Sequence, residues 1–267
     1  RQSWFDRAAE MLDALDEEQG RGLQSTVLRA RMLREQGRPL AGADLLESYI
    51  EEVPQSERGV DPYLVCASYC VEIGATDRAA EVLDAGQPYQ SETAREIDLA
   101  RASLFFRSRQ YEASYEAYRE LAAVLDSKPV KTRVIESLIN LGRYDEAKER
   151  LDDLSATYGM DYAAWLIEAA IANARGTAAL AEGGSEAVRQ AEFFFSQFEN
   201  AIANAKQLGP NEIQPYLLMA EHRQRQAARL EESGEIGSAA RYQDALRELR
   251  QAEELAPGSP AITMRRA

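Results

Sequence analysis

The sequence predicts an all-α protein whose antiparallel helix pairs stack into a right-handed superhelical solenoid. Alanine, leucine, glutamate and arginine are abundant, and the nine prolines and sixteen glycines fall mostly between segments of helical periodicity, where they end or join helices. No alternating apolar run is bounded by an Asn-Gly or Asp-Gly turn, so no segment is expected to form a sheet. A recurring turn supplies the third observation.

This turn sets the period of the array. Gly37, Gly74, Arg109, Gly142 and Gly176 each follow an apolar helical face, and the successive intervals are 37, 35, 33 and 34 residues. Self-similarity at a period between about 20 and 50 residues is typical of stacked repeats, in which each unit buries its apolar face against the next.

Small residues recur in the first helix of five of the six predicted units and in the second helix of five, and they let the helix axes approach closely. The first-helix set is Ala30, Ala67, Ala102, Ala169 and Ala220, and the second-helix set is Gly42, Ala79, Ser114, Ala147 and Ala245. The segment 140–147, Asn-Leu-Gly-Arg-Tyr-Asp-Glu-Ala, adds a tyrosine at the turn and two acids where the next helix begins. Together these features resemble the tetratricopeptide-repeat family over nearly the whole chain.

We expect one solenoid over residues 1–267. The predicted units are regular repeats at 23–54, 60–88, 95–127 and 128–159, then elongated repeats at 162–210 and 213–257. Gly183-Gly184 is expected to form the turn of the first elongated repeat, with Ser185 as N-cap. Residues 1–20 resemble a partial repeat or cap, and 259–267 the start of a cap or further repeat, so either both ends are partial caps or the native array continues.

Composition restricts the partner and the compartment. The net charge of −14 opposes binding of nucleic acid, which requires clustered Lys and Arg, and no stretch approaches the ~20 apolar residues of a membrane span. Only four of the 31 basic residues are lysines, a bias that points to a bacterial source. The compartment stays open between cytoplasm and periplasm.

The family resemblance implies a concave groove, lined by the first helix of each pair, that holds an extended peptide or a partner helix. Counting from the turns places these candidate residues in the groove: Val27, Arg31, Leu64, Ser68, Val71, Leu99, Ser103, Phe106, Glu136 and Asn173. A well-known subset of the family grips a terminal carboxylate with Lys and Asn. Here Val27, Arg31, Asp61, Val65 and Ala100 fill the equivalent places, so recognition of chaperone tails is not expected.

Two apolar segments each have two interpretations. Residues 63–71 are apolar nearly all round, which favours cover by neighbouring helices; the alternative is an apolar binding strip of Leu64, Val71, Leu99 and Phe106. The three residues Phe193-Phe-Phe195 point in different directions on a helix, so at least one should leave the local core. Packing against the elongated helices is favoured there, with a dimer or partner contact as the alternative.

No cofactor, metal site or catalytic activity is predicted. Cys66 and Cys70 share one helical face, where a disulfide fits poorly, and we interpret them as packed core thiols; half a zinc site is the alternative. His222, the only histidine, lies on a helix rich in Arg and Glu and is interpreted as solvated. No nucleophile with an adjacent base and no phosphate-binding loop occurs.

Two functional hypotheses follow. The favoured one is a protein–protein interaction scaffold or adaptor that binds a peptide or partner helix in the groove. The alternative is a structural assembly scaffold, or a self-associating spacer domain of a larger bacterial protein, that uses its ends and elongated C-terminal helices. That alternative includes homo-oligomers.

Overall fold

The structure is a computed structural model that describes residues 2–54, 59–234 and 236–266. All regular secondary structure in these ranges is helical, which confirms the all-α prediction. None of the described helices is long and apolar enough to cross a membrane. The chain divides into two compact units, residues 1–130 and 131–267, and each is described by itself.

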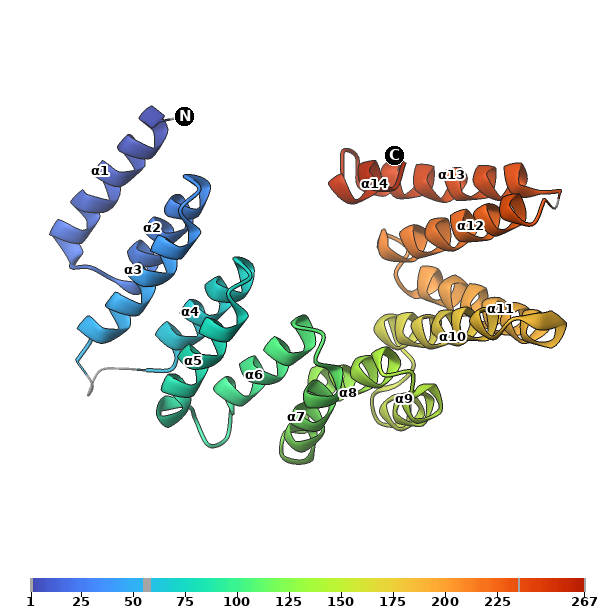
Figure 1. The fold of residues 1–267 in the computed structure, drawn as a ribbon, viewed down its shortest axis with the longest axis horizontal. Helices are drawn as coiled ribbons and strands as arrows, with labels where there is room; N and C mark the ends of the chain where they lie inside the picture. The colour runs from blue at the N-terminus through green and yellow to red at the C-terminus, as the bar shows by residue number, and fades with distance from the viewer. Residues whose placement is uncertain (1, 55–58, 235, 267) are drawn as a thin grey trace. The chain divides into compact units, whose positions relative to one another are not determined.

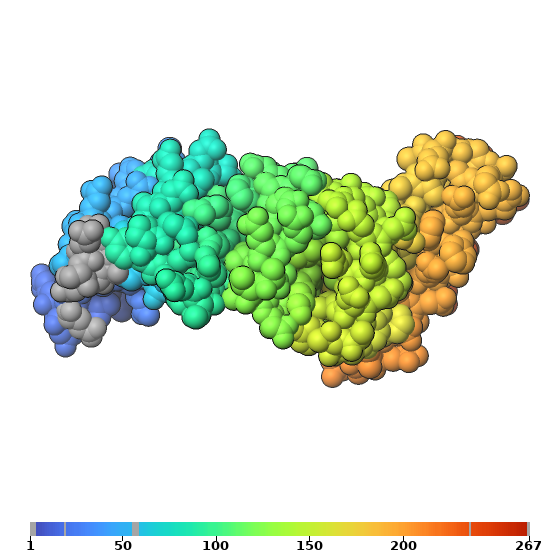
Figure 2. All heavy atoms as spheres, turned by 90° about the horizontal axis from the view of Figure 1, so that it is seen from below, coloured from blue at the N-terminus to red at the C-terminus, as the bar shows by residue number. Residues whose placement is uncertain are grey.

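The first unit consists of a leading helix followed by three helix pairs (Figure 1). These elements are α1 (Gln2–Gln19), α2 (Leu23–Glu35) with α3 (Pro39–Glu52), α4 (Asp61–Glu72) with α5 (Thr76–Gly86), and α6 (Glu96–Arg107) with α7 (Tyr111–Val124). A short 3-10 turn, η2 (Gln87–Tyr89), follows α5. In the space-filling view the cyan-to-green atoms of α4 to α7 pack side by side (Figure 2).

The second unit also consists of helix pairs, and the last two are longer than the others. Its elements are α8 (Lys128–Asn140), whose first residues fall in the first unit, with α9 (Tyr144–Tyr158), then α10 (Tyr162–Glu182) with α11 (Gly184–Leu208), α12 (Gln214–Glu232) with α13 (Ser238–Leu255), and the short α14 (Pro260–Arg266). The four long helices contain 21, 25, 19 and 18 residues, whereas α2 to α9 contain 11 to 15. The predicted elongation of the last two pairs is therefore confirmed.

The turns of the regular pairs share one backbone conformation. Gly37, Gly74, Arg109 and Gly142 have φ of 79°, 80°, 59° and 75°, the left-handed region that favours glycine. The amide that follows each of them donates back to a carbonyl five residues earlier, at 2.8 to 3.0 Å. This is the Schellman arrangement, which satisfies the last carbonyls of a helix. The recurring turn of the sequence is thus a recurring helix stop at these four positions. The fifth expected position, Gly176, is wrong: it lies buried inside α10 (Tyr162–Glu182), which continues to the Gly183-Gly184 turn.

The small residues of the two helices are buried where the helices of a pair approach each other closely. All five first-helix alanines and all five second-helix small residues are buried. Ser114 on α7 donates to the carbonyl of Ala102 on α6 at 3.4 Å, and a Cβ at Gly42 would lie 2.8 Å from the carbonyl oxygen of Ala30. A larger side chain at the second-helix position would push the two helices apart.

The elongated pair α10–α11 carries an additional core beyond the regular repeat. Ala179, Ala191 and Phe195 form a buried cluster, and Phe195 lies where a Cβ at Gly176 would stand. The expected N-cap at Ser185 is wrong: α11 begins at Gly184, with Gly183 as N-cap and no side-chain hydrogen bond. The two glycines, both with positive φ, make the turn without help from a serine.

Candidate binding surface

Eight of the ten candidate residues lie on the first helices of the first unit, and we call this set the first-helix face. Its members are Val27 and Arg31 on α2, Leu64, Ser68 and Val71 on α4, and Leu99, Ser103 and Phe106 on α6. Within each helix they are spaced by three or four residues, so they share one side of that helix. None of the eight is buried, and Arg31 and Ser68 are exposed.

The apolar members of the first-helix face are half-buried. Val27, Leu64 and Val71 pack against the core of the first unit with part of each side chain still accessible. The ring of Phe106 meets that of Tyr111 edge to face, with centroids 5.6 Å apart. Both interpretations of this apolar segment therefore keep support: neighbouring helices cover part of it, and the remainder is accessible.

Ser68 is the accessible centre of the face on α4. It lies four residues after Leu64 and three before Val71, and it is exposed whereas its two apolar neighbours are half-buried. A substitution at Ser68 can therefore change this surface without opening the core.

The sequence analysis missed one residue beside this surface. Leu28 on α2 is 51% exposed and lies three residues before Arg31, on the solvent side of the helix. The counting from the turns placed Val27 on the face and so passed over its neighbour. An exposed leucine two turns from a helix end carries little signal in the sequence alone, since single exposed apolar residues are common.

The last two candidate residues belong to the second unit. Glu136 on α8 is half-buried and accepts a hydrogen bond from Arg133 at 2.6 Å. Asn173 on α10 is also half-buried, and its carbonyl accepts from the Thr177 hydroxyl at 2.8 Å. Each lies on the first helix of its pair, and neither is part of the first-helix face defined above.

The three consecutive phenylalanines of α11 separate as helical geometry requires. Phe195 is buried, Phe194 is half-buried with the Arg175 guanidinium 5.5 Å from its ring centroid, and Phe193 is 60% exposed. Phe193 is therefore the one that leaves the local core, as the sequence required of at least one.

The interpretation of His222 as solvated is wrong. The side chain is only 3% exposed, and its ring lies 5.0 Å and 4.7 Å, between centroids, from those of Phe195 and Phe198. The Gln226 amide nitrogen lies 2.8 Å from Nε2, so the ring accepts a hydrogen bond there, and Glu199 Oε1 lies 3.6 Å away. Burial lowers the pKa of His222 although Glu199 opposes that shift. The elongated α11 supplies the aromatic cover, which no feature local to His222 reveals.

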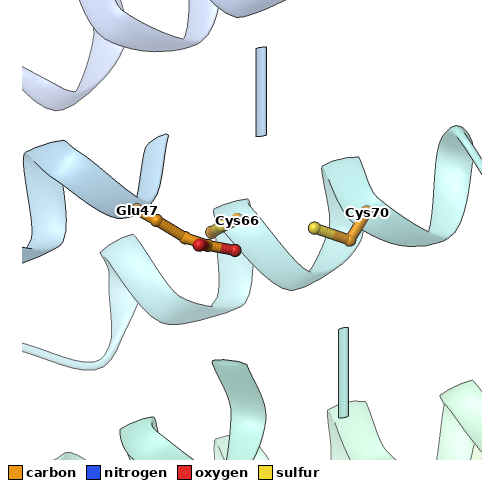
Figure 3. A group of neighbouring side chains, drawn as sticks. All are labelled: Glu47, Cys66 and Cys70. Carbon is orange, nitrogen blue, oxygen red and sulfur yellow. The ribbon is translucent and has the colours of Figure 1, made fainter. Parts of the chain in front are cut away.

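The two cysteines are free and buried, in agreement with their interpretation as core thiols. The structure adds a neighbour that the sequence did not show. The carboxylate of Glu47 on α3 reaches toward Cys66, with Cys70 one turn further along α4 (Figure 3).

The helix pairs, their repeated helix stops and their buried small residues define a helical-repeat protein. Comparison with known proteins gives the particular fold. No family model and no curated protein matches the sequence. Among solved structures, the C-terminal part of a TPR repeat-containing protein from Cytophaga hutchinsonii has a TM-score of 0.55 at 11% identity, over 98% of this chain and 94% of that one. YrrB, described as a TPR protein with an unusual peptide-binding site, has a TM-score of 0.41 at 13% identity, over 84% and 98%.

The chain therefore has the tetratricopeptide-repeat fold. This agrees with the resemblance that the repeated turns and small residues indicated.

Proposed function

We propose that this chain is a protein–protein interaction scaffold that binds an extended peptide or a partner helix on the first-helix face. The observation that supports the proposal is that α2, α4 and α6 each carry half-buried apolar side chains, with the exposed Ser68 between those of α4. Helical repeats of this kind bind partners through surfaces built from successive units, and accessible apolar side chains supply the anchors.

The chemistry of the face favours a partner with apolar side chains and an acidic group. Arg31 is exposed, and no ion pair with a described residue occupies it, whereas Arg34 on the same helix is bound to Glu72 at 2.6 Å. Apolar anchors at Leu64 and Phe106 would supply affinity and Arg31 would orient an acid.

Peptides selected from a displayed random library on the wild-type chain provide the probe. Ser68→Arg places a long cation at the centre of the face on an exposed position, so the fold should stay intact while affinity for the selected peptides falls at least tenfold. Ser48→Arg is the matched control, because Ser48 is exposed on the second helix α3. Equal affinity of both variants, with unchanged circular dichroism, would contradict the proposal.

Self-association is the second candidate, and exposed apolar side chains of α1 favour it. Trp4 and Met11 are 73% and 71% exposed and lie seven residues apart on one side of the helix, with Leu15 one turn further. A charged residue at Trp4 or Met11 should then lower the mass measured by light scattering. The exposed Phe193 of α11 should be tested in the same way, and an unchanged mass in all three variants argues against this candidate.

A further inference from the structure

A cluster of potential metal ligands lies in the first unit, apart from the first-helix face. It consists of the two thiols of Cys66 and Cys70 on α4 and the carboxylate of Glu47 on α3 (Figure 3). Each residue offers one ligand atom, and the three atoms lie within 4.8 Å of one another. Both cysteines are fully buried, whereas the Glu47 side chain is 35% exposed, so the cluster lies at the edge of the core.

The spacing suits a bridging ion better than a disulfide. Residues one helical turn apart have Cβ atoms about 5–6 Å from each other, whereas a disulfide needs about 3.5–4.5 Å. A tetrahedral zinc ion has bonds of about 2.3 Å to sulfur and 2.0–2.2 Å to oxygen, which places its ligand atoms about 3.5–3.8 Å apart.

Both cysteines are free, so each sulfur is available to a metal ion. A thiolate is the form that binds metal, and a bound cation deprotonates a coordinating thiol. Both thiol protons would therefore leave as the ion binds.

Arg78 on α5 completes the charge balance. Its Nη2 lies 2.8 Å from Oε2 of Glu47, its Nε also contacts that carboxylate, and its Nη2 lies 2.7 Å from Asp44. Two thiolates and the Glu47 carboxylate carry three negative charges, which a divalent cation and the Arg78 guanidinium, shared with the exposed Asp44, together offset. Such compensation is what buried charges require. The guanidinium also fixes the orientation of the carboxylate, as second partners of metal ligands do.

We propose that Glu47, Cys66 and Cys70 form a site for a thiophilic divalent cation such as Zn²⁺ or Cd²⁺. Binding replaces the two thiol protons, which are released to solvent, and forms two metal–sulfur bonds and one metal–oxygen bond without any change of oxidation state. The ion would link α3 to α4, the second helix of one repeat to the first helix of the next. It would thus stabilise the stacking of two successive repeats.

Cd²⁺ is the probe, because a cadmium–thiolate bond absorbs in the ultraviolet whereas cadmium held by surface carboxylates does not. The reduced full chain is refolded with Cd²⁺ present, so that burial does not bar entry, and is then desalted. We expect one ion per chain, a charge-transfer band, release of close to two protons per ion, and a raised Tm.

Three variants separate the site from other effects. Cys66→Ser and Cys70→Ser should each lose the band and the Tm increase, and Glu47→Gln should weaken Cd²⁺ binding at least tenfold. Asp44→Asn is the matched control: Asp44 also binds Arg78 but offers no atom to the cluster, so binding should change less than threefold.

Refolded wild-type chain that shows no stoichiometric band overturns the proposal, and this outcome does not depend on whether a variant folds. A band of equal strength in both serine variants also overturns it. If a serine variant loses its helical circular dichroism, Glu47→Gln is compared with Asp44→Asn instead. A smaller Tm increase and smaller proton release on Cd²⁺ addition to Glu47→Gln would support the proposal, and equal responses of the two variants would overturn it.

Discussion

The phenol of Tyr69 occupies the space that a side chain at Gly42 would need. The hydroxyl of Tyr69 on α4 lies 3.0 Å from the carbonyl oxygens of both Ala30 and Pro39 and shares its one proton between them, so the side chain reaches from one repeat into the helix pair of the preceding one. A Cβ at Gly42 would overlap the Tyr69 hydroxyl oxygen and lie 2.8 Å from the Ala30 carbonyl. The close approach of α2 and α3 and the stacking of the next repeat therefore depend on the same glycine.

We expect Gly42→Ala to lower the free energy of unfolding by about 1–3 kcal/mol, because the added methyl group overpacks this contact. Alanine is a better helix former than glycine by about 1 kcal/mol, so the same substitution would stabilise an isolated helix. Urea unfolding measures the difference. Gly59→Ala is the control, since a Cβ there meets nothing within 4 Å, and equal effects at both glycines would count against the contact.

Tyr69→Phe should cost about 1–2 kcal/mol, because it leaves two carbonyls without this donor. It also removes the oxygen that collides with the methyl group added in Gly42→Ala, so the double variant should lose less stability than the sum of the single ones. A double-mutant cycle in urea measures this coupling. Tyr242→Phe, at a 39% exposed site, should be close to neutral, and an additive cycle would disprove the shared contact.

The sequence revealed the parts of the fold that depend on neighbours along the chain. Helix periodicity, the turn residues and the small residues all act within one helix pair, and the turns of the regular repeats recur at intervals of 33 to 37 residues. These features predicted the paired helices and the longer last two pairs. Whether the two units form one solenoid remains a prediction.

The sequence could not reveal contacts that depend on which helices face each other. Glu47 joins the two cysteines from another repeat, and the aromatic rings that bury His222 come from α11, more than twenty residues earlier. The surroundings of His222 in its own helix are Arg and Glu, which suggested solvent. The ten candidate binding residues stay predictions too, because exposure on a first helix does not identify a partner.

Arg109 offers a test of the helix-stop geometry. It adopts φ of 59° where the equivalent Gly74 has 80°, and a left-handed conformation costs an L-residue about 1–2 kcal/mol. Arg109→Gly should therefore stabilise the protein, by up to about 1 kcal/mol once the entropy that glycine loses on folding is subtracted. The reciprocal Gly74→Arg should destabilise it by a similar amount. Urea midpoints that move in the same direction for both variants would contradict this reasoning.

The buried His222 should make the free energy of unfolding depend on pH near the histidine pKa. His222 is the only histidine of the chain, so this dependence can be assigned to it. Its charged neighbours are Glu199 on α11 and Arg223 and Arg229 on α12, and burial is the largest cause of its lowered pKa. Above about pH 7 the ring is neutral in both the folded and the unfolded chain, so its protonation takes nothing from the stability of the folded state.

As the pH falls below the ordinary histidine value of about 6.5, the unfolded chain takes up a proton that the folded chain does not, and stability decreases. The slope can approach about 1.4 kcal/mol per pH unit and ends where the folded ring also protonates. Urea unfolding between about pH 7.5 and 5.5 should show this loss in the wild type, and His222→Gln should show a flatter profile whatever its absolute stability. His222 and Arg223 lower the pKa of Glu199, so this neighbouring carboxylate stays ionised throughout the window. Equal slopes in both proteins would mean that the folded and unfolded states protonate His222 alike.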